Sequence, residues 1–216
     1  EFKRMEKIEN FIISYPKCGR TWIRLVLGSY ILEDREGDPL EVLALTQRDG
    51  NLPTTEFSHD DYPHWKKAHF IHEKKLMYSN KRVVFLVRDP RDTLVSYYFE
   101  YTKRGSKELA NDSEFKGTIS DFIRHNIGGI EGLVKFYNVW AAHWRIPKEF
   151  LLLKYEDFQN NPLLRFTELI NFLAWPATDP GRLKNSIKKG AFNNMKNMEQ
   201  GNVLNNARLK PPEDGD

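Results

Sequence analysis

Lysine, glycine, arginine and threonine cluster where an apolar run meets a helix-like pattern, in ISYPKCGRTWIR at residues 13–24. Beyond the carboxyl end of a parallel strand, the next helix presents free N–H groups and partial positive charge. Gly19 permits close approach of the backbone, Lys17 and Arg20 add positive charge, and the Thr21 hydroxyl can donate to a phosphate oxygen. The segment therefore indicates an anion site, although an ordinary strand–helix turn with solvated Lys17 and Arg20 is an equal alternative. It is not a Walker A loop, because the lysine precedes the glycine.

A second junction repeats this design in VFLVRDPRDTLVSYYF, residues 84–99. Arg88 ends an apolar strand, and Ser96 follows eight residues later, about two helical turns along the next helix. An arginine can grip a phosphate with two parallel hydrogen bonds, and a serine can add a donor. The simpler alternative is that Arg88 pairs with Asp92 and Ser96 is an ordinary helix residue. Taken together, the two junctions favour a ligand with two separate phosphates.

Alternating strands and helices must position these residues. The clearest apolar strands are expected at 11–15, 82–87 and 150–154, with a further strand at 67–71. Helices are expected at 21–32, 90–101, 118–127, 131–144 and 162–173. The polar segments 34–64 and 102–117 are expected to be loops, the first with one short helix. This order predicts one α/β domain over residues 1–216, with a central parallel sheet flanked by helices.

Composition narrows the class of protein. The 216 residues carry a formal charge of only +3, which does not by itself indicate nucleic acid as a partner. Cys18 is the only cysteine, so no internal disulfide can form and a reducing, cytoplasmic compartment is expected. No apolar run reaches membrane-spanning length. His69 and His72 lie close together, but no cysteine or acidic residues stand at the spacing that a zinc site requires.

Four segments, in order, resemble motifs of the sulfotransferase family that uses 3′-phosphoadenosine 5′-phosphosulfate (PAPS). They are YPKCGRTW at 15–22, RDPRDTLVSYYF at 88–99, LLLKYEDF at 151–158 and GAFNNMK at 190–196. The resemblance implies that family's P-loop-NTPase-like fold. It also implies transfer of a sulfuryl group from PAPS to a hydroxyl or amine of a small-molecule acceptor, with the desulfated nucleotide PAP as product.

The resemblance also assigns site residues. The residues that it places around the 5′-phosphosulfate are Lys17, Cys18, Gly19, Arg20, Thr21 and Trp22. Arg88 and Ser96 would bind the 3′-phosphate, and Trp22, Tyr155 and Phe192 would contact the adenine. Cys18 and Arg20 stand where the family usually has serine and threonine. The Arg-Lys-Gly segment that the family carries near its C-terminus does not appear before Asp216.

Sulfuryl transfer requires positioning and charge neutralisation, as phosphoryl transfer does. Lys17 would stabilise the charge on the leaving 5′-phosphate, and no metal is expected. The acceptor needs a base, for which histidine has a suitable pKa. KKAHF at 66–70 resembles the family's Lys-Thr-His segment, which makes His69 the expected base, with His64 and His72 in reserve.

Two other functions stay open at this point. A P-loop-like kinase or nucleotide hydrolase is disfavoured by the missing Walker A pattern and the missing acidic Mg²⁺ site. A non-catalytic nucleotide-binding module remains an alternative, since a sequence does not distinguish it from an enzyme. The acceptor is not readable, although segments 34–64 and 102–117 are expected to line its pocket near Tyr62 and Trp65. The oligomeric state is open, with a homodimer among the alternatives.

Overall fold

A parallel sheet forms the centre of the molecule. The structure is a computed structural model that describes residues 5–33, 35–103, 115, 117–176 and 178–209. Within these residues the sheet has four strands, β1 (Asn10–Ser14), β2 (Thr55–Ser58), β3 (Arg82–Val87) and β4 (Glu149–Lys154). Their order is β2-β1-β3-β4 and every neighbouring pair is parallel. The four carboxyl ends therefore lie along one edge of the sheet.

Apolar runs explain the central strands. All five residues of β1 are buried, and β3 is buried over its four middle residues. Strands that are covered on both faces favour this β-branched, continuously apolar composition. Asn10 and Ser14 are the polar residues of β1. The Asn10 side-chain amide donates to Thr55 Oγ1 at 3.2 Å and to the Leu173 carbonyl at 2.9 Å. This buried amide joins β1 to the edge strand β2 and to the residue that follows α8.

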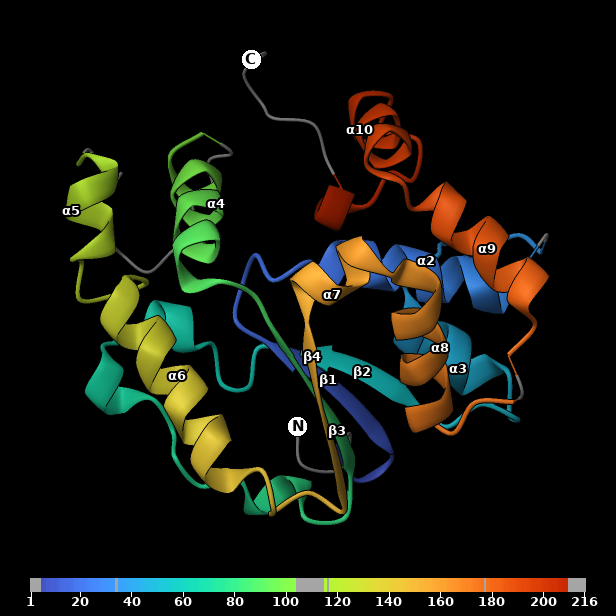
Figure 1. Cartoon of the computed structure of the whole chain (residues 1–216), viewed down its shortest axis with the longest axis horizontal. Coiled ribbons are helices and arrows are strands. Elements are labelled where there is room, and N and C mark those ends of the chain that lie inside the picture. The colour runs from blue at the N-terminus through green and yellow to red at the C-terminus, as the bar shows by residue number, and fades with distance from the viewer. Residues whose placement is uncertain (1–4, 34, 104–114, 116, 177, 210–216) are drawn as a thin grey trace.

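Helices cover both faces of the sheet (Figure 1). One group contains α2 (Arg20–Leu32), α3 (Val42–Arg48), α8 (Pro162–Phe172) and α9 (Pro180–Lys189). The other face carries α6 (Ile130–His143), which packs on α4 (Pro90–Lys103), itself in contact with α5 (Ile119–Ile123). Two further helices, α7 (Tyr155–Asn160) and α10 (Phe192–Gln200), lie near the carboxyl edge with α2 and α4. Short 3₁₀ turns occur at η1 (Pro63–Trp65), η2 (Ala68–Phe70), η3 (Leu76–Tyr78) and η4 (Ala207–Leu209).

The structure confirms the single α/β domain with its parallel sheet, and it corrects one strand. The prediction of a strand at 67–71 is wrong. That segment contains the 3₁₀ turn η2 and makes only an isolated bridge, from Lys67 to Ile127. His69 and Phe70 are exposed there, so the segment lacks the buried face that a strand in this sheet needs. The fourth strand is instead β2, inside the segment expected to be a loop. Its Thr55 and Phe57 point into the core while the alternate residues are partly exposed.

None of the helices in the described part of the chain is long and apolar enough to cross a membrane.

Candidate functional site

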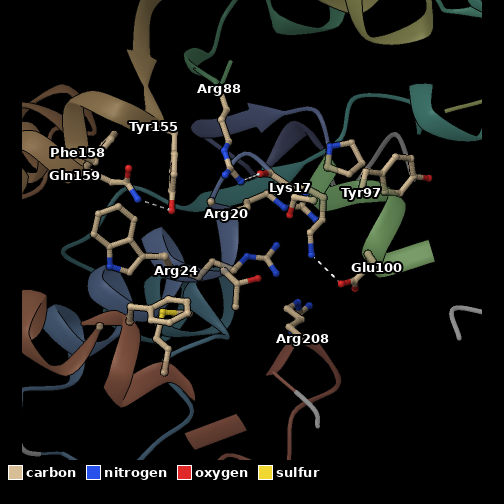
Figure 2. Close-up of a pocket in the computed structure, with 18 of the residues that line it drawn as sticks. Lys17, Arg20, Arg24, Arg88, Tyr97, Glu100, Tyr155, Phe158, Gln159 and Arg208 are labelled. Atoms are coloured by element: carbon tan, nitrogen blue, oxygen red, sulfur yellow. Dashed lines mark hydrogen bonds and ion pairs between the residues drawn. The ribbon is translucent and has the colours of Figure 1, made fainter. Parts of the chain in front are cut away.

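A pocket of about 710 Å³ opens above the carboxyl edge of the sheet. Each strand delivers one lining residue just after it ends: Lys17 after β1, His59 after β2, Arg88 after β3 and Tyr155 after β4. Figure 2 shows Tyr155, Phe158 and Gln159 on one side of this space and Lys17 with Glu100 on the other. The parallel topology thus brings residues far apart in the sequence into one site.

The loop between β1 and α2 is shaped for an anion. Lys17 and Gly19 both adopt left-handed backbone angles, with φ of 66° and 88°. A Cβ on Gly19 would lie 2.4 Å from the Tyr155 ring, so this position requires glycine for two reasons. The Lys17 ammonium donates to Glu100 Oε2 at 2.8 Å across the pocket. The first turn of the long helix α2, beginning at Arg20, supplies the free N–H groups and positive dipole that bind phosphates.

Arg88 is held in place beside this loop. Its guanidinium donates to the Lys17 carbonyl at 3.0 Å and stacks on the Tyr155 ring, 4.7 Å from the ring centroid. Its backbone exchanges hydrogen bonds with the Tyr137 hydroxyl, at 3.1 and 3.0 Å. Arg88 Nε is buried and has no protein partner in the described structure, while Ser96 on α4 lines the same pocket. The site can therefore accept a phosphate between Arg88 and Ser96.

An aromatic wall closes the β4 side of the pocket. The Trp22 ring lies 5.8 Å from Tyr155 and 6.2 Å from Phe158, both edge to face. Phe192, at the start of α10, lines the pocket and is 80% exposed. Rings arranged in this way offer a slot for a flat aromatic group such as a nucleobase.

Two histidines stand at the β2 side. His59 Nδ1 donates to the Ser14 carbonyl at 2.8 Å, since that oxygen can only accept, so Nε2 keeps its lone pair. Burial and the nearby Arg20 guanidinium hold the pKa of His59 well below its usual value. His64 lies 5.0 Å away, ring to ring, and the same two causes lower its pKa to about 3. Both imidazoles are therefore neutral at physiological pH, and the His59 ring has a free basic nitrogen.

Three arginines also line this pocket: Arg20 and Arg24, one turn apart on α2, and Arg208 from η4. Burial and the neighbouring arginines lower the pKa of Arg20 to about 9. The pKa of Arg24 is lowered to about 10 by burial and by Arg208. The pocket is thus strongly electropositive, with Glu100 as its acidic lining residue among those described.

The sulfotransferase domain family matches residues 7–210 of the chain. The chain belongs to the sulfotransferase family. This assignment agrees with the resemblance of the four sequence motifs, which all lie inside the matched range.

Individual sulfotransferases are similar over most of the chain. Flavonol 3-sulfotransferase of Flaveria bidentis is 25% identical over 224 residues, covering 94% of this chain and 69% of that protein. Sulfotransferase 2A1 of Rattus norvegicus is 28% identical over 207 residues, covering 88% and 68%. The chain thus spans about two thirds of the length of these relatives.

Solved structures show the same fold. Mouse sulfotransferase SULT7A1, complexed with PAP, superposes with a TM-score of 0.57 at 19% identity, covering 88% of this chain and 66% of that one. Retinol dehydratase, in complex with androsterone and the inactive cofactor PAP, gives a TM-score of 0.58 at 16% identity, covering 96% and 73%. At these identities the likeness concerns the fold alone.

The structure gathers most of the residues that the sequence motifs singled out. The predicted residues that line the sulfotransferase pocket are Lys17, Gly19, Arg20, Thr21, Trp22, Arg88, Ser96, Tyr155 and Phe192. Cys18 instead points into the core, where its thiol contacts the Tyr137 hydroxyl at 3.5 Å. Burial raises the pKa of this thiol to about 11, so it stays protonated and only its backbone N–H is available to a ligand.

His69, the expected base, does not line the pocket. It is exposed in η2, with its ring 4.2 Å from that of Phe70. His72 is exposed as well, whereas the other reserve, His64, does line the pocket. The choice of His69 depended on a strand at 67–71, and that strand is absent from the described sheet.

Sequence reasoning missed His59, Arg24 and Arg208. A signal for His59 existed, because it directly follows TEFS, whose alternation places Thr55 and Phe57 inside. Arg24 shares a helix face with Arg20, at i and i+4, so it too could have been found. For Arg208 the sequence carried no such signal, because it reaches the pocket through tertiary packing.

Proposed function

We propose that this sulfotransferase moves a sulfuryl group from PAPS to a hydroxyl or amine of a small-molecule acceptor. One observation carries the proposal: Lys17 and Arg88, at the ends of adjacent strands, flank one pocket with an aromatic wall beside them. PAPS has two phosphate positions and an adenine, which match two cationic positions and an aromatic slot. The PAP in both solved relatives supports the same donor.

The donor would lie along the β3–β4 side of the pocket. Arg88 and Ser96 would bind the 3′-phosphate, and Trp22, Tyr155 and Phe192 would enclose the adenine. The phosphosulfate would meet the first N–H groups of α2, with Thr21 adding a hydroxyl donor. Lys17 would exchange its contact with Glu100 for the 5′-phosphate, whose negative charge grows as its bond to sulfur breaks.

We infer that His59 serves as the base, rather than His69. The acceptor oxygen attacks the sulfur, the bond between sulfur and the 5′-phosphate oxygen breaks, and the acceptor proton passes to His59 Nε2. The products are the sulfated acceptor and PAP, with the proton on His59 then released to water. Lys17 would stabilise the leaving phosphate, since its contact strengthens as charge develops there.

The test compares PAP with 5′-AMP, which lacks only the 3′-phosphate. We expect PAP to bind at least about tenfold more tightly by calorimetry, because a bidentate arginine–phosphate contact is a strong, charge-assisted one. Arg88→Gln should remove most of that difference and leave 5′-AMP binding unchanged. Arg91→Gln is the matched control, since Arg91 is exposed and paired with Asp89 outside the pocket. Equal affinities of the wild-type protein for PAP and 5′-AMP would overturn the assignment of Arg88.

A further inference from the structure

Two arginines of the pocket, Arg20 and Arg24, make no direct ion pair within the described residues, although the charges of Glu56 and Glu41 act on Arg24 from a distance. Arg24 is only 8% exposed, and its guanidinium stacks on the Phe57 ring at 4.7 Å. Among the described residues neither Arg24 nor Arg20 makes a side-chain hydrogen bond or an ion pair, although five donors are available on each. Arg208 joins them from η4, where it also pairs with Glu41.

Such an arrangement is unfavourable in the empty protein. Burial removes part of the hydration of these guanidinium groups, and like charges close by repel them further. The lowered pKa values of Arg20 and Arg24 have these two causes, burial first and neighbouring arginines second. An oxyanion bound among the three guanidinium groups would reduce both penalties, because its negative charge offsets theirs and its oxygens accept charge-assisted hydrogen bonds from them.

The arginines belong to the histidine side of the pocket. The Arg20 charge acts on both His59 and His64, and Arg24 stacks on Phe57 of β2. The aromatic wall follows β4, three strand spacings away from β2, which is about 14 Å. Figure 2 shows Arg208 well apart from Tyr155, with Arg24 between them. The cluster thus lies where an acceptor would meet His59.

We propose that Arg20, Arg24 and Arg208 bind an anionic group of the acceptor, a carboxylate, sulfate or phosphate. This inference rests on the proposed function and adds the substrate class: a hydroxyl or amine compound that already carries a negative charge. Arg20 has the central place, because its backbone belongs to the phosphate loop while its charge acts on the two histidines. The cluster would set the acceptor's orientation by holding its anionic end away from the transferred group.

The experiment uses the PAP-saturated protein, so that the nucleotide positions are filled. 4-Hydroxybenzoate and 4-hydroxybenzamide have nearly the same shape and differ in charge, and both are titrated by calorimetry. We expect the carboxylate to bind at least about tenfold more tightly than the amide. Arg24→Gln should reduce this preference to within about twofold, while the affinity for PAP stays within about threefold of wild type.

Arg145→Gln is the matched control, because Arg145 also stacks on an aromatic ring, 4.9 Å from the Trp144 centroid, but lies outside the pocket. It should retain the full preference for the carboxylate. Arg24→Gln should also keep or raise the melting temperature of the unliganded protein, because it removes an unpaired buried charge. A structural arginine would instead lower the melting temperature when replaced.

Each remaining outcome overturns the inference. Equal binding of the two probes, or no measurable binding of either, would contradict the proposal that the acceptor carries an anionic group. A loss of PAP affinity in Arg24→Gln as large as in Arg88→Gln would assign the cluster to the donor instead. If the wild-type protein fails to bind PAP at all, the proposed function fails first, and this outcome is separate from the two above.

Discussion

At the scale of single residues, one backbone contact sets the orientation of His59, one of the two histidines that line the pocket. The Ser14 carbonyl accepts from His59 Nδ1 and leaves Nε2 as the basic nitrogen. Ser14 ends β1 and His59 follows β2, so the pairing of these two strands fixes the imidazole. His69 has no such support and is exposed.

The different surroundings of His59 and His69 predict different effects when each is replaced. His59→Ala should lower turnover by roughly 10²–10⁴, the usual loss for a general base, and leave the affinity for PAP nearly unchanged. His69→Ala, the matched control, should keep near-normal turnover. Initial rates with labelled PAPS and a validated acceptor measure both. Normal turnover of His59→Ala, or a large loss in His69→Ala, would reverse the two assignments.

The donor side of the site could be predicted from the sequence more fully than the acceptor side. Lys17 and Arg88 follow strands that are long, apolar and flanked by clear helices, so their positions were evident. His59 follows β2, a four-residue strand inside a polar segment, whose alternation is too short to stand out. In the arginine cluster, the spacing of Arg20 and Arg24 on one helix is visible in the sequence, whereas Arg208 joins them only through tertiary packing.

At the scale of elements, a buried polar cluster anchors the segment after β2. Asp60 accepts from the Lys75 ammonium at 2.7 Å, the Tyr78 hydroxyl at 2.9 Å and Trp140 Nε1 at 2.9 Å. These partners come from the loop before η3, from η3 itself and from α6. Asp60 directly follows His59, so these three contacts hold the backbone beside the histidine in place.

Lys75→Met should destabilise the protein by about 3–5 kcal/mol, because it leaves a buried carboxylate without its cation. The double variant Asp60→Asn/Lys75→Met should recover part of that loss, since no unpaired charge remains. Urea unfolding measures the free energy of all three proteins. A single variant as stable as wild type would mean that Asp60 is compensated by its other two donors.

The same cluster explains why the strand expected at 67–71 was wrong. The backbone is left-handed at Asp60, Asp61 and Tyr62, which turns the chain after β2 toward η1. Segment 67–71 then follows as a turn over α6 rather than as a strand in the sheet. Its apolar residues indicated burial correctly at Ala68 and Ile71, but burial alone does not distinguish a strand from a 3₁₀ turn.

At the scale of the whole molecule, the two pocket histidines make stability depend on pH. The folded-state pKa values of His59 and His64 lie below the unfolded value of about 6.5, so the unfolded chain binds more protons below that pH. The free energy of unfolding therefore decreases as pH falls below about 6.5, by up to about 1.4 kcal/mol per pH unit for each histidine.

Urea unfolding of the unliganded protein between pH 7 and pH 5 tests this. His64→Phe should make the stability of the protein less dependent on pH, because one proton fewer is taken up on unfolding. A wild-type stability that is constant across this range would show that the histidines are protonated in the folded state.

The placement of two tryptophans gives the pocket an optical reporter at each end. Trp22 belongs to the aromatic wall, while Trp65, which also lines the pocket, stacks on Tyr62 with ring centroids 4.7 Å apart. Stacking of adenine on Trp22 should quench its fluorescence, so Trp22→Phe should abolish the signal of PAP and leave that of the acceptor. Trp65→Phe should do the reverse. Filling of the two halves of the pocket can thus be followed separately in one unlabelled protein, and the order in which donor and acceptor bind becomes measurable by stopped flow.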